Sequence, residues 1–227
     1  MKKILVASVL ITSTISTAWS GEVYGGYGLV TGAHAGFSHR LTEKFGVRAE
    51  ANTFNYSRSF SISGSQYAAK ADVSGASVYV DYMALWPITS HVRLTAGLGL
   101  GKSDLSADKS SGTTVTLGDN SYILRPEDKF GMNIRYPSLM PYLGLGTGHH
   151  RSEKGFNFYA DAGVFFGKPD LTFHYSDAFK GQIKTDLNPN GTISVADLQK
   201  EEAKVRAEVD KIKFMPVIKL GVSYSFD

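Results

Sequence analysis

The chain has no cysteine among its 227 residues. Exported proteins of this size often depend on disulfides, so a chain without any must close its structure by other means. Long hydrophobic runs are also missing, because after residue 20 no stretch approaches the roughly 20 apolar residues of a membrane-spanning helix. Basic runs interleaved with aromatic residues are absent as well, which argues against nucleic acid as a partner.

The longest apolar run lies at the N-terminus and has the layout of a secretory signal. Two lysines precede an apolar stretch at 4–15, and small residues ending at Ser20 offer a cleavage site. A membrane-spanning helix is the alternative, but the run is too short to cross about 30 Å of hydrocarbon. We therefore expect residues 1–20 to be a signal peptide and residues 21–227 to form one barrel domain.

The rest of the chain is dominated by alternation of apolar and polar residues, which predicts β-strands with one apolar face. The clearest segments are 47–52, 78–86, 92–101, 156–166 and 218–226. A soluble β-sandwich would contain similar single strands. A membrane barrel also explains why aromatic residues collect at the strand ends, as in an interfacial girdle. The girdle candidates are Phe45, Trp86, Phe156, Tyr224 and Phe226.

Short and long connections alternate, which is typical of outer-membrane barrels with tight periplasmic turns and longer extracellular loops. Counting hairpins back from Phe226 predicts strands at about 22–30, 32–41, 45–61, 66–86, 91–108, 139–149, 155–176 and 214–226. The predicted fold is all-β, an antiparallel eight-stranded transmembrane barrel in the bacterial outer membrane. Barrel closure leaves no free strand edge, so it also supplies the closure that disulfides would otherwise give.

One segment, 194–212, breaks the β pattern. It is rich in charged helix-forming residues, and Ser194 and Asp197 are placed as a capping pair. Its narrow apolar stripe consists of Leu198, Val205, Val209 and Ile212. We expect one short helix in the last long extracellular loop, with the stripe packed on the barrel rim or a neighbouring loop.

Several segments resemble a known family of small outer-membrane barrels. They are SVYVDYMALWP at 77–87, PYLGLG at 141–146, FYADAGVFFGKPDLTF at 158–173 and FMPVIKLGVSYSF at 214–226. In these segments the chain is similar to the carbapenem-resistance-associated CarO type, and more distantly to OmpW-like and OmpA-like barrels. The resemblance implies an eight-stranded barrel, with uptake of small basic amino acids as the proposed family activity. Met83 and Leu85 stand where relatives carry charge, which makes this lumen drier.

The face predicted to line the lumen carries as many cations as anions. The charged residues are Arg48, Glu50, Asp81, Arg93, Asp161 and Lys219, and Tyr159 lies among them. Eight strands leave an interior just wide enough for side chains, so charges there must be paired. Two interpretations remain open. The set forms a salt-bridged plug, or it lines a narrow polar pathway with Asp81 and Asp161 as an acidic attraction site.

The stretch 186–197 has the spacing of a calcium loop. Its candidate ligands are Asp186, Asn188, Asn190, Thr192, Ser194 and Asp197. Gly191 stands at the position of the sharp turn, and a predicted helix follows. Because only two carboxylates are present, any binding of Ca²⁺ is expected to be weak. An Asn-Pro-Asn-Gly turn that leads into a helix cap is the alternative.

Catalytic signatures are weak. His149 and His150 fall in a predicted periplasmic turn and are expected to be solvated. His174, Ser176 and Asp177 cluster near the predicted outer rim. Neighbours along a strand point to opposite faces, so these side chains cannot simply converge, and no enzymatic activity is expected.

Two functions therefore remain, with a lipid-modifying barrel enzyme as a remote third. The first is a narrow channel for small solutes such as basic amino acids. The second is a closed structural or adhesive barrel whose extracellular loops bind a partner. The expected partners in both cases are outer-membrane lipid and the barrel-assembly machinery, which recognises the C-terminal strand.

Overall fold

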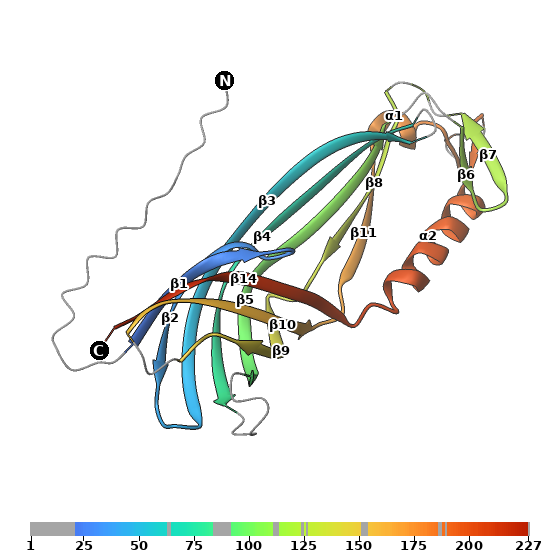
Figure 1. Cartoon of the computed structure of the whole chain (residues 1–227). Coiled ribbons are helices and arrows are strands. Elements are labelled where there is room, and N and C mark those ends of the chain that lie inside the picture. Colours follow the sequence, from blue (N-terminus) through green and yellow to red (C-terminus); the bar gives the residue numbers. More distant parts are fainter. Residues whose placement is uncertain are drawn as a thin grey trace, which may run out of the picture.

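The computed structural model describes residues 21–62, 65–83, 92–110, 114–123, 125, 127–150, 154–185, 188 and 190–226. The predicted signal peptide, Trp86 and Asp186 lie outside the described residues. Figure 1 shows a tall β-structure that carries two helices at one end and both termini of the barrel at the other.

Eight strands close into a ring. They are β1 (Gly21–Gly28), β2 (Gly32–Arg40), β3 (Phe45–Ile62), β4 (Ser65–Met83), β5 (Val92–Ser110), β9 (Leu139–Thr147), β10 (Gly155–Phe166) and β14 (Phe214–Phe226). Neighbouring strands pair antiparallel, β14 pairs with β1, and the pairing of β5 with β9 completes the ring. The predicted eight-stranded antiparallel barrel is confirmed.

The outside of the ring is apolar and its inside is polar, which reverses the arrangement of a soluble protein. On the outer face Leu100 is 61% and Phe158 is 85% exposed, whereas Asp81 and Arg93 on the inner face are at most 2% exposed. Such an apolar belt would be costly in water, where each Å² left unburied forgoes about 25 cal/mol. In hydrocarbon the same belt is the stable arrangement. The fold is therefore a transmembrane barrel and not a sandwich.

Aromatic side chains collect at the end of the barrel that has short connections. The rings of Phe156 and Tyr224 lie 4.9 Å apart, and those of Phe45 and Tyr82 lie 5.2 Å apart. The ring of Phe226 approaches that of Phe37 at 6.3 Å. The first two pairs join neighbouring strands and the third reaches across β1, all at the level where an interfacial girdle is expected.

Part of the barrel continues far beyond the ring. β3, β4 and β5 stay paired up to Ile62, Ser65 and Ser110. Above the ring β8 (Lys129–Arg135) takes the place of β9 beside β5, and β11 (Asp170–Tyr175) pairs with β8. We call β8, β11 and the upper parts of β3, β4 and β5 the tall wall (Figure 1).

Two expectations about strands were wrong in part. The single strand expected over 155–176 is interrupted at 167–169, where Pro169 has no N–H to donate; the pairing with β14 ends at the hydrogen bond from the Gly167 N–H to the Lys213 carbonyl at 3.0 Å. The stretch 109–138, which connects two of the expected strands, contains β6 (Thr114–Leu117), β7 (Asn120–Ile123) and β8.

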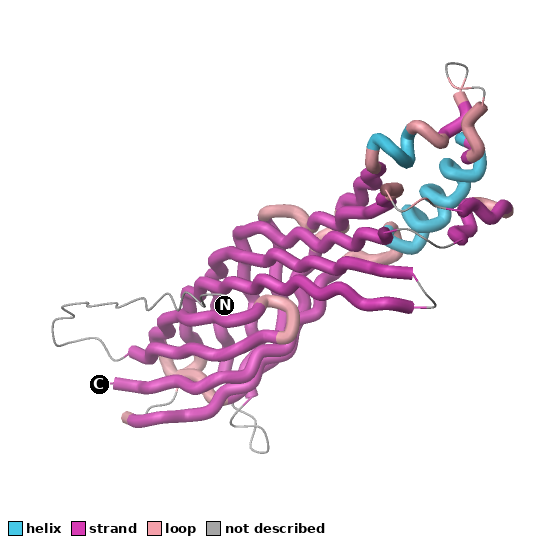
Figure 2. The backbone as a smooth tube through the Cα atoms, turned by 90° about the horizontal axis from the view of Figure 1, so that it is seen from above, coloured by secondary structure: helices cyan, strands magenta, loops and turns pink. Residues whose placement is uncertain are grey.

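A small tip sits on top of the tall wall (Figure 2). It contains the hairpin of β6 and β7, the short helix α1 (Asp177–Lys180), which was not predicted from the sequence, β12 (Ile183–Lys184), β13 (Ile193–Ser194) and α2 (Val195–Val209). Its buried apolar side chains are Leu117, Phe179, Ile193 and Leu198. The helix predicted over 194–212 is therefore present but ends earlier. No helix in the described part of the chain is long and apolar enough to span a membrane.

The helix α2 also protects the free edge of the tall wall. Arg206 donates from Nη1 to the Leu171 carbonyl at 3.3 Å, and its guanidinium lies over the Phe173 ring at 5.9 Å. The Tyr175 hydroxyl donates to Glu202. A backbone carbonyl at a strand edge that accepts a helix side chain is less available to another strand.

Candidate functional site

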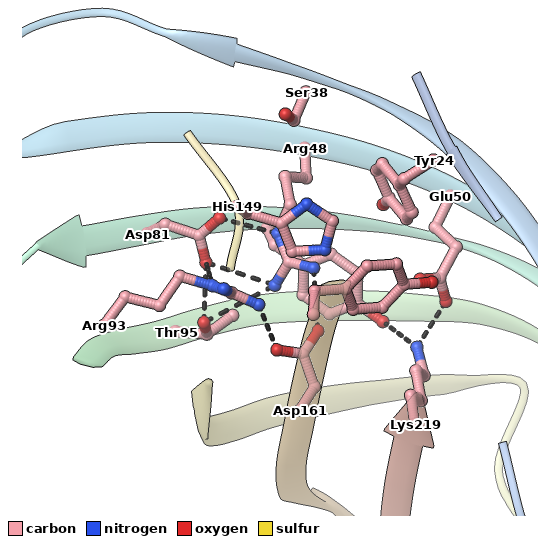
Figure 3. Close-up of polar contacts among 12 residues, drawn as sticks. Tyr24, Ser38, Arg48, Glu50, Asp81, Arg93, Thr95, His149, Asp161 and Lys219 are labelled. Atoms are coloured by element: carbon pink, nitrogen blue, oxygen red, sulfur yellow. Dashed lines mark hydrogen bonds and ion pairs between the residues drawn. The ribbon is translucent and has the colours of Figure 1, made fainter. Parts of the chain in front are cut away.

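All six charged residues predicted for the lumen lie inside the ring, each at 5% exposure or less (Figure 3). Alternation along the strands is the cause. On β3, Arg48 and Glu50 are buried inside, while the intervening Ala49 is exposed on the outer face. The six come from β3, β4, β5, β10 and β14, so they meet only because the ring closes.

Two arginines and two aspartates form the middle of this set, and we call Arg48, Asp81, Arg93 and Asp161 the central cluster. Arg48 donates from Nε and Nη2 to the two carboxylate oxygens of Asp81, at 2.6 and 3.2 Å. Its Nη1 donates to Asp161 at 2.9 Å. Arg93 pairs with Asp161, and its Nε lies 3.4 Å from Asp81. Each carboxylate thus joins both guanidinium groups, and the four charges cancel.

Neutral and basic neighbours complete the shell around Asp81. The Thr95 hydroxyl donates to its Oδ1 at 2.6 Å, and His150 Nε2 lies 2.6 Å from its Oδ2. The guanidinium of Arg48 also lies over the Tyr79 ring, 4.9 Å from its centre. Such a network is expensive to break, since removing one member leaves a buried charge without its partner.

The remaining pair lies one step further along the strands. Lys219 on β14 pairs with Glu50 and donates to the Tyr79 hydroxyl at 3.1 Å. Tyr159, also predicted for this network, is buried, and its hydroxyl lies 2.5 Å from His34 Nε2. Lys219 and Glu50 therefore extend the central cluster toward the tall wall.

The expectation for the two adjacent histidines was wrong. His149 and His150 are buried, and the turn after β9 folds them into the lumen, with a φ of 61° at His150. His149 pairs with Glu22, which also accepts from the Ser38 hydroxyl at 3.2 Å. Glu22 was missed as a lumen charge, although its even-numbered position on β1 matches the inward Tyr24 and indicated the same face.

An aromatic layer lies above the charges. Its members are Tyr79, Tyr136, Met140, Tyr142, Phe165, Met215 and Val217. The rings of Tyr142 and Phe165 lie 4.8 Å apart, and that of Tyr79 lies 5.1 Å from Tyr142. Gly99 makes the layer possible, since a Cβ there would come within 2.7 Å of the Phe165 ring.

Together, charges and aromatic side chains occupy the ring at successive levels. One cavity beside the aromatic layer, bordered by Ser77, Met140 and Phe165, has a volume of about 30 Å³. That space holds about one water molecule. The arrangement can keep a barrel shut and rigid, and a solute could pass only if side chains moved.

The candidate calcium ligands do not share one orientation. Asn188 donates from Nδ2 to the Gly181 and Ile183 carbonyls, at 2.8 and 3.1 Å. The Asp197 carboxylate accepts from Asn120 at 2.7 Å and from the Tyr122 hydroxyl. Among the described residues no group of three or more His, Asp or Glu side chains could hold a metal ion. The calcium site stays a prediction.

The capping pair predicted for the helix is only half correct. Ser194 is the N-cap residue of α2, but its side chain makes no capping hydrogen bond. Asp197 instead binds the β6–β7 hairpin. The hydrogen bond from the Tyr122 hydroxyl, and then that from the Asn120 amide, holds the pKa of Asp197 below that of a free aspartate. The first turn of α2 is thereby fastened to the hairpin.

The residues near the outer rim that could have served an enzyme have structural partners. His174 Nε2 lies 2.5 Å from Asp108 on the outer face of the tall wall. The Ser176 hydroxyl accepts from the Phe179 N–H at 3.2 Å and caps α1. His174 and Ser176 therefore do not form a nucleophile and base pair in this structure.

The geometry defines a class: an eight-stranded transmembrane barrel with ion pairs and aromatic side chains packed inside the ring and a tall wall above it. No protein-family model matches the chain, and no curated protein sequence matches it. Solved structures do. CarO2 of Acinetobacter baumannii aligns over 92% of this chain and 99% of its own, with 18% identity and a TM-score of 0.65. CarO of Acinetobacter baumannii aligns over 90% and 97%, with 17% identity and a TM-score of 0.63. The resemblance to CarO-type barrels therefore holds for the fold.

Proposed function

We propose that the protein is a bacterial outer-membrane barrel whose lumen is closed, and whose tall wall and tip act as a binding surface outside the membrane. The apolar belt and the CarO-like fold support the location. The long extensions above the ring lie at the end opposite the turns that follow β2, β4 and β9, and this supports an orientation with the tall wall facing outward. The alternating strand β14, ending at Phe226, is the segment that we expect the barrel-assembly machinery to recognise.

One observation supports the proposal that the lumen is closed: the central cluster and the aromatic layer occupy the lumen at successive levels. To open a path, Arg48 would have to leave both Asp81 and Asp161. Moving one buried ion away from its partners costs several kcal/mol even after relaxation. Thermal motion alone would therefore open the lumen only rarely.

A narrow channel for small solutes such as basic amino acids is the second candidate, and the CarO-like fold is what favours it. The charge balance opposes it. A cationic solute that entered the central cluster would meet Arg48 and Arg93 beside Asp81 and Asp161, with no surplus of negative charge to attract it. The closed barrel accounts for the same residues without any movement.

Conductance separates the two candidates. The folded full-length barrel would be inserted into planar bilayers, and single-channel currents would be recorded for wild type and for Asp81→Ala. Asp170→Ala is the matched control, because Asp170 is an exposed aspartate on the tall wall. Heat-modifiable mobility on gels would verify that each variant is folded.

We expect wild-type protein to give no defined current steps. Steps in wild type that change in Asp81→Ala but persist unchanged in the Asp170→Ala control would refute the closed barrel and support the channel. If steps occur only in Asp81→Ala, the ion pairs are what keep the lumen shut.

A further inference from the structure

A groove marks the outer face of the barrel where the ring meets the tall wall. It forms where β8 gives way to β9 and has a volume of about 420 Å³. The lining residues are Gly101, Lys102, Ser103, Arg135, Tyr136, Pro137, Ser138, Lys168 and Asp170. We call it the rim groove. Its lining carries three cations against one carboxylate.

The height of the rim groove is set by the residues directly below it. The outward side chains of β5 are apolar from Val92 to Leu100, and the next outward residue is Lys102. Leu139 of β9 pairs with Leu100 and is also exposed. Between Leu100 and Lys102, two successive outward residues of β5, the outer surface changes from apolar to charged. The groove therefore lies at the boundary between hydrocarbon and headgroups.

The three cations are available to a ligand. The side chains of Lys102, Arg135 and Lys168 are 53%, 64% and 63% exposed. Lys102 and Arg135 both contact Asp104, which holds them side by side, at 3.3 and 2.7 Å. Exposed ion pairs of this kind contribute little on their own, so an incoming anion can share the two cations.

Further carboxylates border the groove and set what it can accept. Asp72 lies 2.7 Å from Lys102, and Asp210 lies 3.0 Å from Lys168. Asp72, Asp104, Arg135 and Asp170 follow one another across the strands in register. A ligand with phosphate groups next to sugar hydroxyls matches cations that alternate with carboxylates, since the hydroxyls can donate to the carboxylates.

From this placement we propose that the rim groove binds the phosphorylated headgroup of an outer-leaflet glycolipid. Its phosphate would lie between Lys102, Arg135 and Lys168. Its acyl chains would lie along Leu100 and Leu139. A lipid meets both halves of the site, the cationic groove and the apolar strip beneath it, whereas free phosphate meets only the first. The proposal goes beyond the closed barrel and depends only on the barrel's orientation in the membrane.

The proposal is tested by measuring how much lipid A binds to the protein. Folded full-length protein would be placed in phosphatidylcholine nanodiscs that contain increasing amounts of diphosphoryl lipid A, and bound lipid would be measured by native mass spectrometry. The triple variant Lys102→Gln, Arg135→Gln, Lys168→Gln removes the groove's cations. The matched control, Lys180→Gln, Lys200→Gln, Lys204→Gln, removes three similarly exposed cations from the tip. Single Lys168→Gln serves if the triple variant fails to fold.

We expect the apparent affinity for lipid A to fall about fivefold for each cation removed and about a hundredfold in the triple variant. The control should bind as wild type does, and dephosphorylated lipid A should bind weakly to all. Equal losses in the triple variant and the control would overturn the proposal, as would equal binding of dephosphorylated lipid. Displacement by millimolar inorganic phosphate alone would assign the groove to a free anion and also overturn it. Because the readout is bound lipid and not current, failure here leaves the closed lumen to its own test.

Discussion

Replacing Arg48 by methionine tests whether the central cluster holds the barrel shut and stable. Methionine keeps a long, unbranched side chain but removes three hydrogen bonds to Asp81 and Asp161, at 2.6, 3.2 and 2.9 Å. Arg93 is then the one guanidinium left for two buried carboxylates. Removing one partner of a buried ion pair costs about 3–5 kcal/mol, so we expect Arg48→Met to lower the free energy of unfolding by that amount.

The assay is equilibrium unfolding in urea of barrels folded into phospholipid vesicles, followed by tryptophan fluorescence and by heat-modifiable mobility on gels. Arg58→Met is the control, since Arg58 is on the same strand β3 but is exposed on the tall wall. We expect the control to change the free energy of unfolding by no more than about 0.5 kcal/mol, as is usual for surface substitutions.

A double variant makes the reasoning refutable. Arg48→Met with Asp161→Leu removes one charge of each sign and leaves Arg93 paired with Asp81. We expect it to recover at least half of the stability lost in Arg48→Met, because no unpaired charge remains. If the double variant is as unstable as the two single variants added together, the four residues do not act as a neutral cluster and the interpretation of the plug is wrong.

Two further predictions concern packing and the tip. A Cβ added at Gly146 would collide with Arg93 and Asp161 of the central cluster. Gly146→Ala should therefore lower the free energy of unfolding, measured in urea, by about 1–3 kcal/mol. Gly25→Ala is the control on β1, where a Cβ has room, and it should lower the free energy of unfolding by less. At the tip, Tyr122→Phe should raise the pKa of Asp197 toward that of a free aspartate in an NMR titration, and Tyr56→Phe on the wall should not. Folding lowers the pKa of Asp197. The link between α2 and the β6–β7 hairpin therefore stabilises the tip fully at pH values above the pKa of a free aspartate, and this stabilisation is lost as the pH falls through the lowered pKa of the folded state. An unchanged Asp197 titration in Tyr122→Phe would contradict the assignment.

The ring of eight strands was predictable because its physics is local. Each strand needs one apolar face for lipid, so residues such as Val78, Val80 and Leu98 recur at every second position. The upper strands β8 and β11 face water on the outer side and the inner side of the tall wall on the other, so their alternation of apolar and polar residues is weaker. Phe130, Met132 and Ile134 do alternate, and that signal could have identified β8.

The members of the lumen network were predictable for the same reason, but their partners were not. Alternation assigns Arg48 and Asp161 to the inner face, and only the closure of the ring decides that they touch. His149 and His150 could not be placed by alternation, because they follow a strand and enter the lumen through a turn with a left-handed residue. The pairing of Glu22 with His149 therefore had to come from the structure.

The charged lumen has a consequence for how such a chain reaches its membrane. A packed apolar interior would be as stable as ion pairs, or more so, once the barrel is folded. A strand with apolar residues on both faces, however, would be a continuous hydrophobic run, and over the 18 residues of β3 such a run would be long enough for a membrane-spanning helix. Alternating Arg48 and Glu50 with Val47 and Ala49 keeps β3 polar enough to cross as an unfolded chain. The central cluster is then best understood as a filling compatible with export, whose charges cancel only after the ring closes.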